Sequence, residues 1–214
     1  MKHFSSSDTP LTSQLASTIT SLQLSSDEFD IRRLADLLAW LHPAAARLGL
    51  TNYRDIQTYI AQLVVPALYL LSPTLAPYRL SPMLDFGAGS GAVGLSLACL
   101  LPEAEVVLAD RRSRVVQFLD LAVSRGGLRN CRSLLADLSA PSPEQQGSCG
   151  TVLIRAYGPT TEALRQAVLW TRPEGTIALW HQPPAPDPPD HLTRADTLQT
   201  SVPALALTIY RRDT

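Results

Sequence analysis

The sequence predicts an α/β fold, a Rossmann-like doubly wound sheet with helices on both faces, and three observations support this prediction. Short runs rich in valine, isoleucine and leucine recur after residue 82, as is typical of buried parallel strands. Helical or loop-length spacers separate the first four runs. A glycine-rich stretch, "LDFGAGSGAVG" at 84–94, joins the first run to the first helix, where folds of this class bind ligands.

The expected strands are the apolar runs "PMLDF", "EVVLAD", "CRSLLA", "TVLIRA" and "GTIALW". Apolar spacing predicts helices over 91–101, 112–125 and 159–171. A final strand is expected at 204–210, "ALALTIY", antiparallel to the others. Five prolines within 181–190, "HQPPAPDPPD", predict an irregular loop before it.

The region before residue 82 has a different pattern, which predicts helices. Ser25 and Glu28 have the spacing of a capping box, and the apolar residues after them indicate a helix ending near Pro43. A second helical pattern follows Asn52, and Pro66 should kink or divide it.

Prolines at positions 73, 77 and 82 mark the expected domain boundary, because they disfavour both helix and central strand. We therefore expect a flexible N-terminal arm at 1–25, a helical N-terminal subdomain at 26–81 and a cofactor-binding domain at 82–214.

Composition excludes several classes of protein. The 214 residues are 45% hydrophobic, enough for a real core. A net charge of −1 gives no general attraction to nucleic acid, although a local basic face remains compatible with it. No apolar run is long enough to span a membrane. The cysteines Cys99, Cys131 and Cys149 are too far apart to predict a disulfide framework or a zinc site, so we expect a metal-free, cytoplasmic monomer.

The glycine stretch predicts a bound nucleoside with a cationic end. Gly89, Gly91 and Gly94 fit the dinucleotide fingerprint, which is a weak signal alone. Asp85 at the end of the first strand, followed by Gly87, is more informative, because a carboxylate there would repel a pyrophosphate and attract an ammonium group. The stretch therefore favours the amino-acid part of S-adenosylmethionine.

Two further strand ends supply candidate contacts to the nucleoside. Asp110 ends the second strand and lies where a carboxylate can accept both ribose hydroxyls; alternatively, it caps the next helix. Asp137 follows the third strand and could accept the adenine amino group, or it could be a solvated turn residue. Arg111, Ala136 and Ala88 complete the expected cofactor-binding set.

With these residues assembled, the chain resembles the class I S-adenosylmethionine-dependent methyltransferases, and more narrowly the bacterial glucose-inhibited division protein B family. The similarity runs from about residue 30 to the end. It is carried by "LADLLAWLHPAAARLGLT", by "LDFGAGSGAVGLSLACLLPEAEVVLAD", by "SRVVQFL" and by "IRAYGP". The resemblance implies a methyltransferase that uses S-adenosylmethionine and modifies guanine N7 in 16S ribosomal RNA, with that RNA or the small ribosomal subunit as partner.

The chain also departs from the family pattern. The family's Pro-Gly pair is Val93-Gly94 here, its Lys-Arg pair is Arg114-Val115, and its His-x-x-Asp-Ser-Leu stretch is "LVVPALYL". Its Arg-x-Glu motif is "LLADL", and the lysine expected after the fifth strand is absent. Two alternatives therefore stay open: a small-molecule methyltransferase on the same core, and a degenerate relative that binds cofactor or RNA without catalysis.

The expected catalytic groups are two residues, Arg155 at the end of the fourth strand and Tyr157 just after it. Guanine N7 carries a lone pair and no proton, so methyl transfer to it needs positioning and electrostatics rather than a general base. Arg155 should lie beside the methyl donor, binding cofactor and a phosphate or guanine oxygen. Tyr157 could stack on an unpaired base, or it could pack under the loop. Trp180 and His181 are expected to line the same mouth. Arginines around the second helix could meet phosphates or form a solvated face: Arg111, Arg112, Arg114, Arg125, Arg129 and Arg132.

Overall fold

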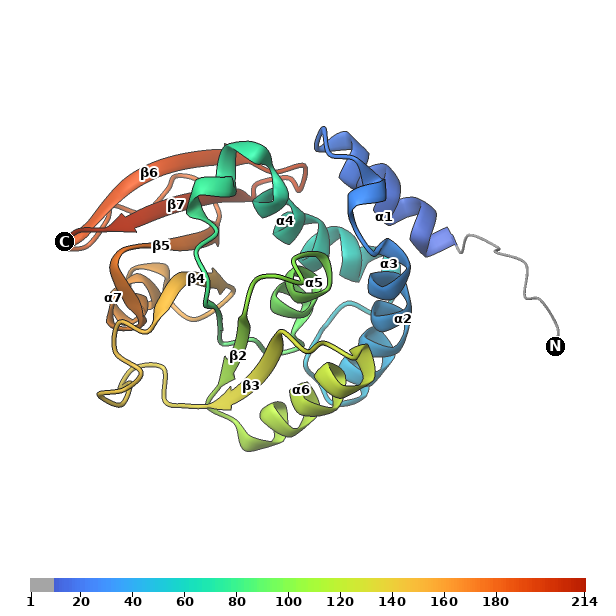
Figure 1. The fold of residues 1–214 in the computed structure, drawn as a ribbon, viewed down its shortest axis with the longest axis horizontal. Coiled ribbons are helices and arrows are strands. Elements are labelled where there is room, and N and C mark those ends of the chain that lie inside the picture. Colours follow the sequence, from blue (N-terminus) through green and yellow to red (C-terminus); the bar gives the residue numbers. More distant parts are fainter. Residues whose placement is uncertain (1–9) are drawn as a thin grey trace, which may run out of the picture.

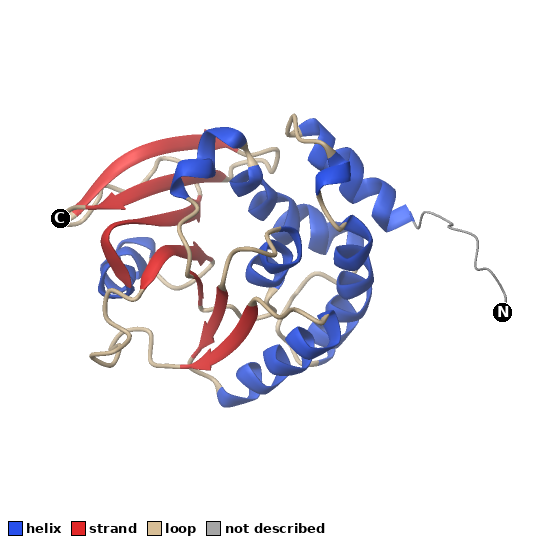
Figure 2. Cartoon of the chain, viewed as in Figure 1, coloured by secondary structure: helices blue, strands red, loops and turns tan. Residues whose placement is uncertain are grey.

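The computed structural model describes residues 10–214, and within them one seven-stranded sheet organises the molecule (Figures 1 and 2). The strand order is β3-β2-β1-β4-β5-β7-β6. Strands β1 to β5 are parallel, whereas β7 pairs antiparallel with β5 and β6 antiparallel with β7. The bounds are β1 Met83–Phe86, β2 Val106–Asp110, β3 Cys131–Leu135, β4 Cys149–Arg155, β5 Thr171–His181, β6 Leu192–Gln199 and β7 Ala206–Arg212. This topology confirms the predicted fold class.

The expected helices between the strands are present. They are α5 (Ala92–Leu100), α6 (Ser113–Gly126) and α7 (Thr160–Trp170). Strand β6 was not predicted, because its burial pattern leaves most of its side chains exposed or half-buried. It pairs only with β7, at the edge of the sheet.

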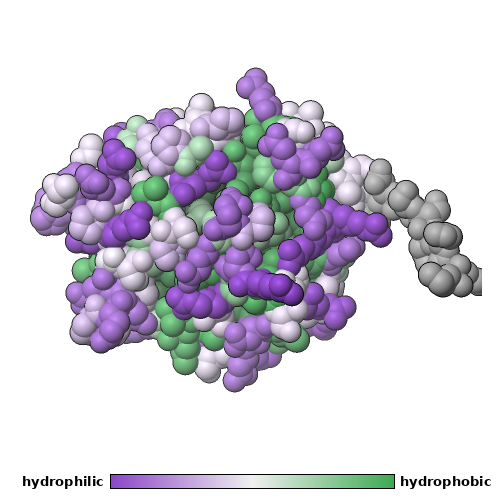
Figure 3. All heavy atoms as spheres, in the orientation of Figure 1, coloured by the Kyte–Doolittle hydropathy of each residue, from purple (hydrophilic) through white to green (hydrophobic). Residues whose placement is uncertain are grey.

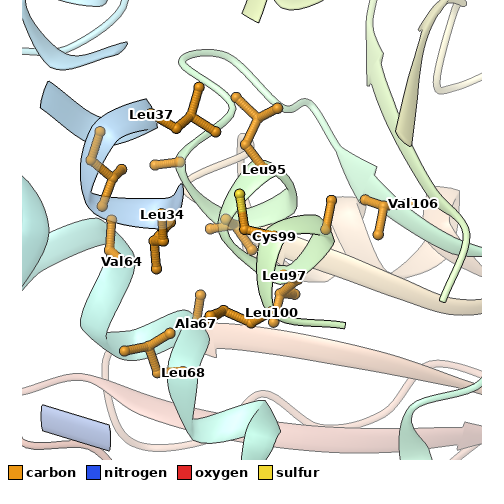
Figure 4. Packing of buried hydrophobic residues seen from close by; sticks show 14 of the residues in the cluster. Leu34, Leu37, Val64, Ala67, Leu68, Leu95, Leu97, Cys99, Leu100 and Val106 are labelled. Atoms are coloured by element: carbon orange, nitrogen blue, oxygen red, sulfur yellow. The ribbon is translucent and has the colours of Figure 1, made fainter. Parts of the chain in front are cut away.

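Both faces of the sheet are covered, as predicted. Alternate side chains of each strand point to opposite faces, so Leu84 and Phe86 join the cluster under α7 while Met83 joins the other. The larger cluster lies between the sheet and the helices α1 to α6. Figure 4 shows part of it, where Leu34 and Leu37 of α2 meet side chains of α5 and three residues of the next helical segment, Val64, Ala67 and Leu68.

The expectation of a loose N-terminal arm over residues 1–25 is wrong for its described part. Helix α1 spans Pro10–Ser21 and buries Leu11, Leu15 and Ile19 at a spacing of four residues, which places them on one helix face. It lies beside α2 in Figure 1. Residues 1–9 lie outside the described part of the chain.

The predicted capping box is also wrong. Ser25 makes no side-chain cap and is followed by a single 3₁₀ turn, Ser26–Glu28. The long helix α2 (Ile31–Arg47) begins instead at Asp30, whose carboxylate accepts from the backbone N–H of Arg33 at 3.0 Å. The predicted helix end near Pro43 is wrong as well, because α2 continues through Pro43 and ends at Arg47.

The second helical pattern is divided, as predicted, and the interruption lies directly before Pro66 rather than at it. It begins with α3 (Ile56–Tyr59), widens into a π-helical turn at Ile60–Val64, and resumes as α4 (Val65–Leu68). A 3₁₀ turn, Tyr69–Leu71, ends it. We call residues 56–71 the divided helix.

The segment after the divided helix is not purely irregular. A 3₁₀ helix spans Pro73–Tyr78, which tolerates the prolines that exclude a longer helix. Residues on both sides of the expected boundary at 81–82 share one hydrophobic cluster, so the division into two domains remains a proposal.

The proline-rich stretch at 181–190 forms a loop after β5, as predicted, and rests against the antiparallel edge. Tyr210 and Arg194 both donate to the carbonyl oxygen of Pro186, at 2.7 and 3.0 Å. Among the described helices, none is long and apolar enough to cross a membrane.

Candidate cofactor and acceptor site

Most of the sequence-predicted site residues lie at the carboxyl ends of β1, β2 and β4, whereas Ala136 and Asp137 follow β3. Strand order reverses between β1 and β4, and crevices at such reversals bind ligands in open α/β sheets. Three cavities of about 240, 430 and 450 Å³ open along this edge. Ala156, directly after β4, lines all three.

The smallest cavity, which we call the loop cavity, is built on the glycine stretch. It is lined by Asp85, Gly87, Ala88, Gly89 and Arg155, together with Ser90, Ala92, Val93, Arg112 and the side chains of Leu50 and Leu63. The buried Tyr59 holds the loop in place, because its hydroxyl donates to the Ser90 hydroxyl at 3.1 Å. The first helical region therefore forms part of the site.

The glycines of the loop serve different purposes. Gly87, Gly89 and Gly91 have φ values of +78°, +54° and +75°, a region in which side chains are unfavourable. A Cβ atom on Gly91 would lie 2.6 Å from Leu95 and 2.8 Å from Leu119. Among the three, only Gly89 has room for a side chain, because a Cβ atom there would make an ordinary contact with the Gly87 carbonyl oxygen at 3.8 Å.

Gly94 allows helix α5 to approach strand β1. Its N–H donates to the Asp85 carboxylate at 2.8 Å, and a Cβ atom there would lie 2.8 Å from the same oxygen. The glycine thus serves packing between α5 and β1, one of the roles that glycines have in nucleotide-binding loops.

Asp85 is a buried carboxylate at the wall of the loop cavity. It is 4% exposed, and its pKa is raised from 3.8 to about 7, first by burial and further by the negative charge of Asp110, against the lowering by the Gly94 hydrogen bond. A cationic ligand beside it would favour the ionised form. The position fits the ammonium-binding role predicted for it.

Asp110 is already surrounded by donors. Arg112 donates to both of its oxygens from Nε and Nη2, each at 3.0 Å, and from its backbone N–H at 3.0 Å. The backbone N–H of Gly89 donates at 3.2 Å. Burial opposes ionisation of Asp110, but these contacts outweigh it and hold the pKa below its usual value. The carboxylate also connects the glycine loop to β2.

Of the residues predicted to contact the nucleoside, Asp110 and Arg111 line the second cavity, whereas Asp137 lies on the surface. The 430 Å³ cavity, which we call the nucleoside cavity, is lined by Gly87, Asp110, Arg111, Tyr157 and residues that begin α7. Asp137 is exposed and accepts from the backbone and hydroxyl of Ser139 at 3.0 and 2.7 Å. Neither Asp137 nor Ala136 lines this cavity, so the adenine contact remains a prediction.

Arg155 has an unusual environment at the end of β4. Its Nη2 donates to the backbone carbonyl of Gln62, whereas Nε and Nη1 are buried and have no hydrogen-bond partner in the described part of the chain. Burial lowers its pKa. Arg155 is a lining residue of both the loop cavity and the 450 Å³ cavity.

Tyr157 packs against the loop. Its ring lies where a side chain on Gly87 would be, and it meets Phe86 edge-on with 4.8 Å between ring centroids. It is half-buried and lines the nucleoside cavity and the 450 Å³ cavity. The packing that the sequence left as an alternative is therefore present, and stacking on a base stays a prediction.

The 450 Å³ cavity, which we call the acceptor cavity, brings together Arg155, Tyr157, Trp180 and His181, as expected. His181 is held at both ring nitrogens, Nδ1 against the carbonyl of Gln182 at 2.9 Å and Nε2 against the hydroxyl of Thr208 at 2.8 Å. These contacts fix its ring as part of the wall. Trp180 donates to the carbonyl of Pro66 at 3.0 Å.

Sequence reasoning missed several wall residues. Glu162, Ala163 and Gln166 reach the nucleoside cavity from α7, and their only signal was their place just after the fourth strand.

Two arginines of the basic cluster expected around α6 have partners within the protein. Arg132 pairs with Glu105 at 3.2 Å, and Arg125 lies 5.4 Å from the ring centroid of Trp40. No group of metal-binding side chains occurs in the part of the chain that the structure describes.

Comparison with known proteins identifies the family of the chain. The family model GidB, rRNA small subunit methyltransferase G, matches residues 30–183. The chain belongs to this family. A ribosomal RNA small subunit methyltransferase G from Hydrogenovibrio crunogenus is 30% identical over 144 residues, 67% of this chain and 63% of the relative.

Two other relatives of the same name differ in the length matched. The one from Shewanella halifaxensis is 27% identical over 63% of each chain. The one from Shewanella loihica is 26% identical over 91% of this chain and 93% of its own. The matches to the Shewanella halifaxensis and Hydrogenovibrio crunogenus proteins thus each cover 63% of the relative's own length, somewhat less than two thirds.

Solved structures support the fold. TrmN from Thermus thermophilus aligns over 69% of this chain and 48% of its own, with a TM-score of 0.53 and 21% identity. TYW2 from P. horikoshii, solved in complex with MeSAdo, aligns over 67% and 64%, with a TM-score of 0.51 and 15% identity. The sheet is therefore that of the class I methyltransferases.

Proposed function

We propose that this GidB-family protein transfers a methyl group from S-adenosylmethionine to N7 of a guanine in 16S ribosomal RNA. The observation that carries the proposal is the shared wall of the loop and acceptor cavities. Arg155 and Ala156 line both, so a donor held on the glycine loop and an acceptor base between β4 and β5 would meet at these residues.

The residues of the loop cavity fit S-adenosylmethionine. Asp85 offers a carboxylate to an ammonium group, and the unpartnered nitrogens of Arg155 offer donors to a carboxylate. Asp110 lines the adjoining nucleoside cavity, where its two oxygens can accept ribose hydroxyls. The bound cofactor would supply an electrophilic methyl group on a sulfonium sulfur.

The remaining chemistry needs little from the protein beyond placement. Guanine N7 would form the new bond with its own lone pair while the carbon–sulfur bond breaks and its electron pair stays on sulfur as a neutral thioether, so no side chain would need to remove a proton. Arg155 would orient the acceptor through a phosphate or guanine oxygen, and Tyr157 would limit where the base can lie. Ala156 has a φ of +54°, a conformation uncommon for a residue with a side chain, and strain of this kind concentrates at functional sites.

A methyl-transfer assay tests the proposal. We expect labelled methyl from S-adenosylmethionine to enter unmethylated 16S rRNA or 30S subunits, and chain cleavage specific for N7-methylguanine to locate it. Asp110→Ala should abolish cofactor binding, whereas Asp196→Ala, on the exposed edge strand, should not. Cofactor binding without transfer to either RNA substrate would reject the RNA acceptor and favour a small-molecule acceptor. Absence of cofactor binding would favour the degenerate relative.

A further inference from the structure

The divided helix contacts the carboxyl ends of two neighbouring strands through its main chain. Arg155 of β4 and Trp180 of β5 are register partners in the sheet. Arg155 donates to the carbonyl of Gln62, and Trp180 donates to the carbonyl of Pro66 at 3.0 Å. The two acceptors are four residues apart, about one helical turn, so one stretch of helix meets both strand ends.

Proline explains why the Gln62 carbonyl can accept from Arg155. In a continuous α-helix this carbonyl would accept from the N–H of residue 66. Proline has no N–H and disturbs the preceding turn, and the π-helical turn at Ile60–Val64 comes directly before α4. π-helical turns of this kind are frequent at functional sites.

The contact also determines where the rest of the guanidinium points. Because Nη2 is held by the helix, Nε and Nη1 are the nitrogens left for a ligand, and both are buried without another partner in the described chain. A guanidinium is planar, with its donors in a fixed fork. Fixing one nitrogen therefore orients the other two.

We propose that Pro66 is a positioning residue: by freeing the main-chain carbonyl of Gln62, it holds the Arg155 side chain at the wall that the loop cavity shares with the acceptor cavity. The inference rests on the proposed use of S-adenosylmethionine. Since the acceptor is a main-chain atom, no side-chain substitution at Gln62 removes it. Pro66 is the residue at which the contact can be altered.

Pro66→Ala restores an N–H that competes with Arg155 for the Gln62 carbonyl. Alanine favours helix more than proline does, so this variant should fold, which a thermal unfolding curve checks. Pro73→Ala, at the exposed start of the 3₁₀ helix, is the matched control for losing a proline ring. Calorimetric titration with S-adenosylmethionine is the readout for both, alone and combined with Arg155→Ala.

We expect Pro66→Ala to weaken cofactor binding about tenfold, the scale of one hydrogen bond to a charged group. In the Arg155→Ala background, Pro66→Ala should cause no further weakening, because the residue on which it acts is gone. Pro73→Ala should bind as the wild type does. Wild-type affinity for Pro66→Ala, or equal weakening in both backgrounds, would overturn the positioning role.

The same titrations separate this inference from the proposed function. If the wild type binds cofactor but does not methylate rRNA, the substrate assignment fails and the double-mutant comparison still tests Pro66. If the wild type does not bind S-adenosylmethionine, both are wrong.

Discussion

Arg112 and Asp110 form a two-pronged ion pair at the carboxyl end of β2, where we propose that a ribose binds. Nε and Nη2 of the arginine donate to the two carboxylate oxygens at 3.0 Å each. The carboxylate is buried, at 3% exposure, whereas the arginine side chain is 56% exposed. Ribose hydroxyls would need the same oxygens, so the arginine must move aside when they bind.

This competition predicts that Arg112→Gln tightens cofactor binding. Because the arginine is more than half exposed, solvent screens the pair and its strength is about 1 kcal/mol or less. Removing this competition should lower the dissociation constant about two- to fivefold. Calorimetric titration with S-adenosylmethionine measures this. Arg114→Gln, two residues along on α6, is the control and should leave affinity unchanged. Weaker binding by Arg112→Gln would instead mean that the arginine itself contacts the cofactor.

Asp85 predicts a pH dependence of cofactor affinity. Its pKa of about 7 leaves it mostly protonated at pH 6, and the ionised form attracts the ammonium group. Affinity should therefore rise about fivefold from pH 6 to pH 7, following the ionised fraction of such a group. Titration at the two pH values checks this, and Asp85→Asn should bind weakly at both. A wild-type affinity independent of pH would contradict the ammonium contact.

The same group should affect stability in the opposite direction. The folded-state pKa of Asp85 lies above the unfolded value of 3.8, so its contribution is fully present below about pH 4 and is lost as pH rises through about 7. Asp85→Asn keeps an oxygen for the Gly94 N–H. Its free energy of unfolding, measured with denaturant, should lack the part of the wild type's decline between about pH 4 and 7 that comes from Asp85. An equal decline in both proteins would place its origin elsewhere.

The parts of the fold that the sequence predicted are those where burial is continuous. Strands β1, β2 and β4 are apolar because both of their faces are covered, and the glycine loop has a recognisable spacing. Strand β6 has no such run, since its stability comes from pairing with β7. Helix α1 buries only one narrow stripe, whose spacing is masked by serine and threonine.

The site was predictable in the positions that strand ends determine, and less so in its contacts. Asp85, Asp110 and Arg155 lie at the expected edge because parallel strands end together. The pairing of Arg112 with Asp110 depends on a side-chain rotamer, and the contact of Arg155 with Gln62 joins segments 93 residues apart. Local sequence patterns carry neither kind of information.

Gly87 and Gly49 allow a test of the packing of Tyr157. Both have positive φ, +78° and +67°, but a Cβ atom on Gly49 would meet nothing within 4 Å, whereas on Gly87 it would collide with the Tyr157 ring. Gly49→Ala should therefore cost about 1 kcal/mol of unfolding free energy, the conformational penalty alone. Gly87→Ala should cost about 1–3 kcal/mol more, as overpacking does.

Denaturant unfolding of both variants measures the difference. Tyr157→Ala removes the ring and should reduce the cost of Gly87→Ala to that of Gly49→Ala, because only the backbone penalty remains. If Gly87→Ala costs the same with and without the tyrosine, the ring does not restrict the loop. The tyrosine would then be free to turn toward an acceptor base, and the position of its ring next to Gly87 would contribute nothing to the free energy of unfolding.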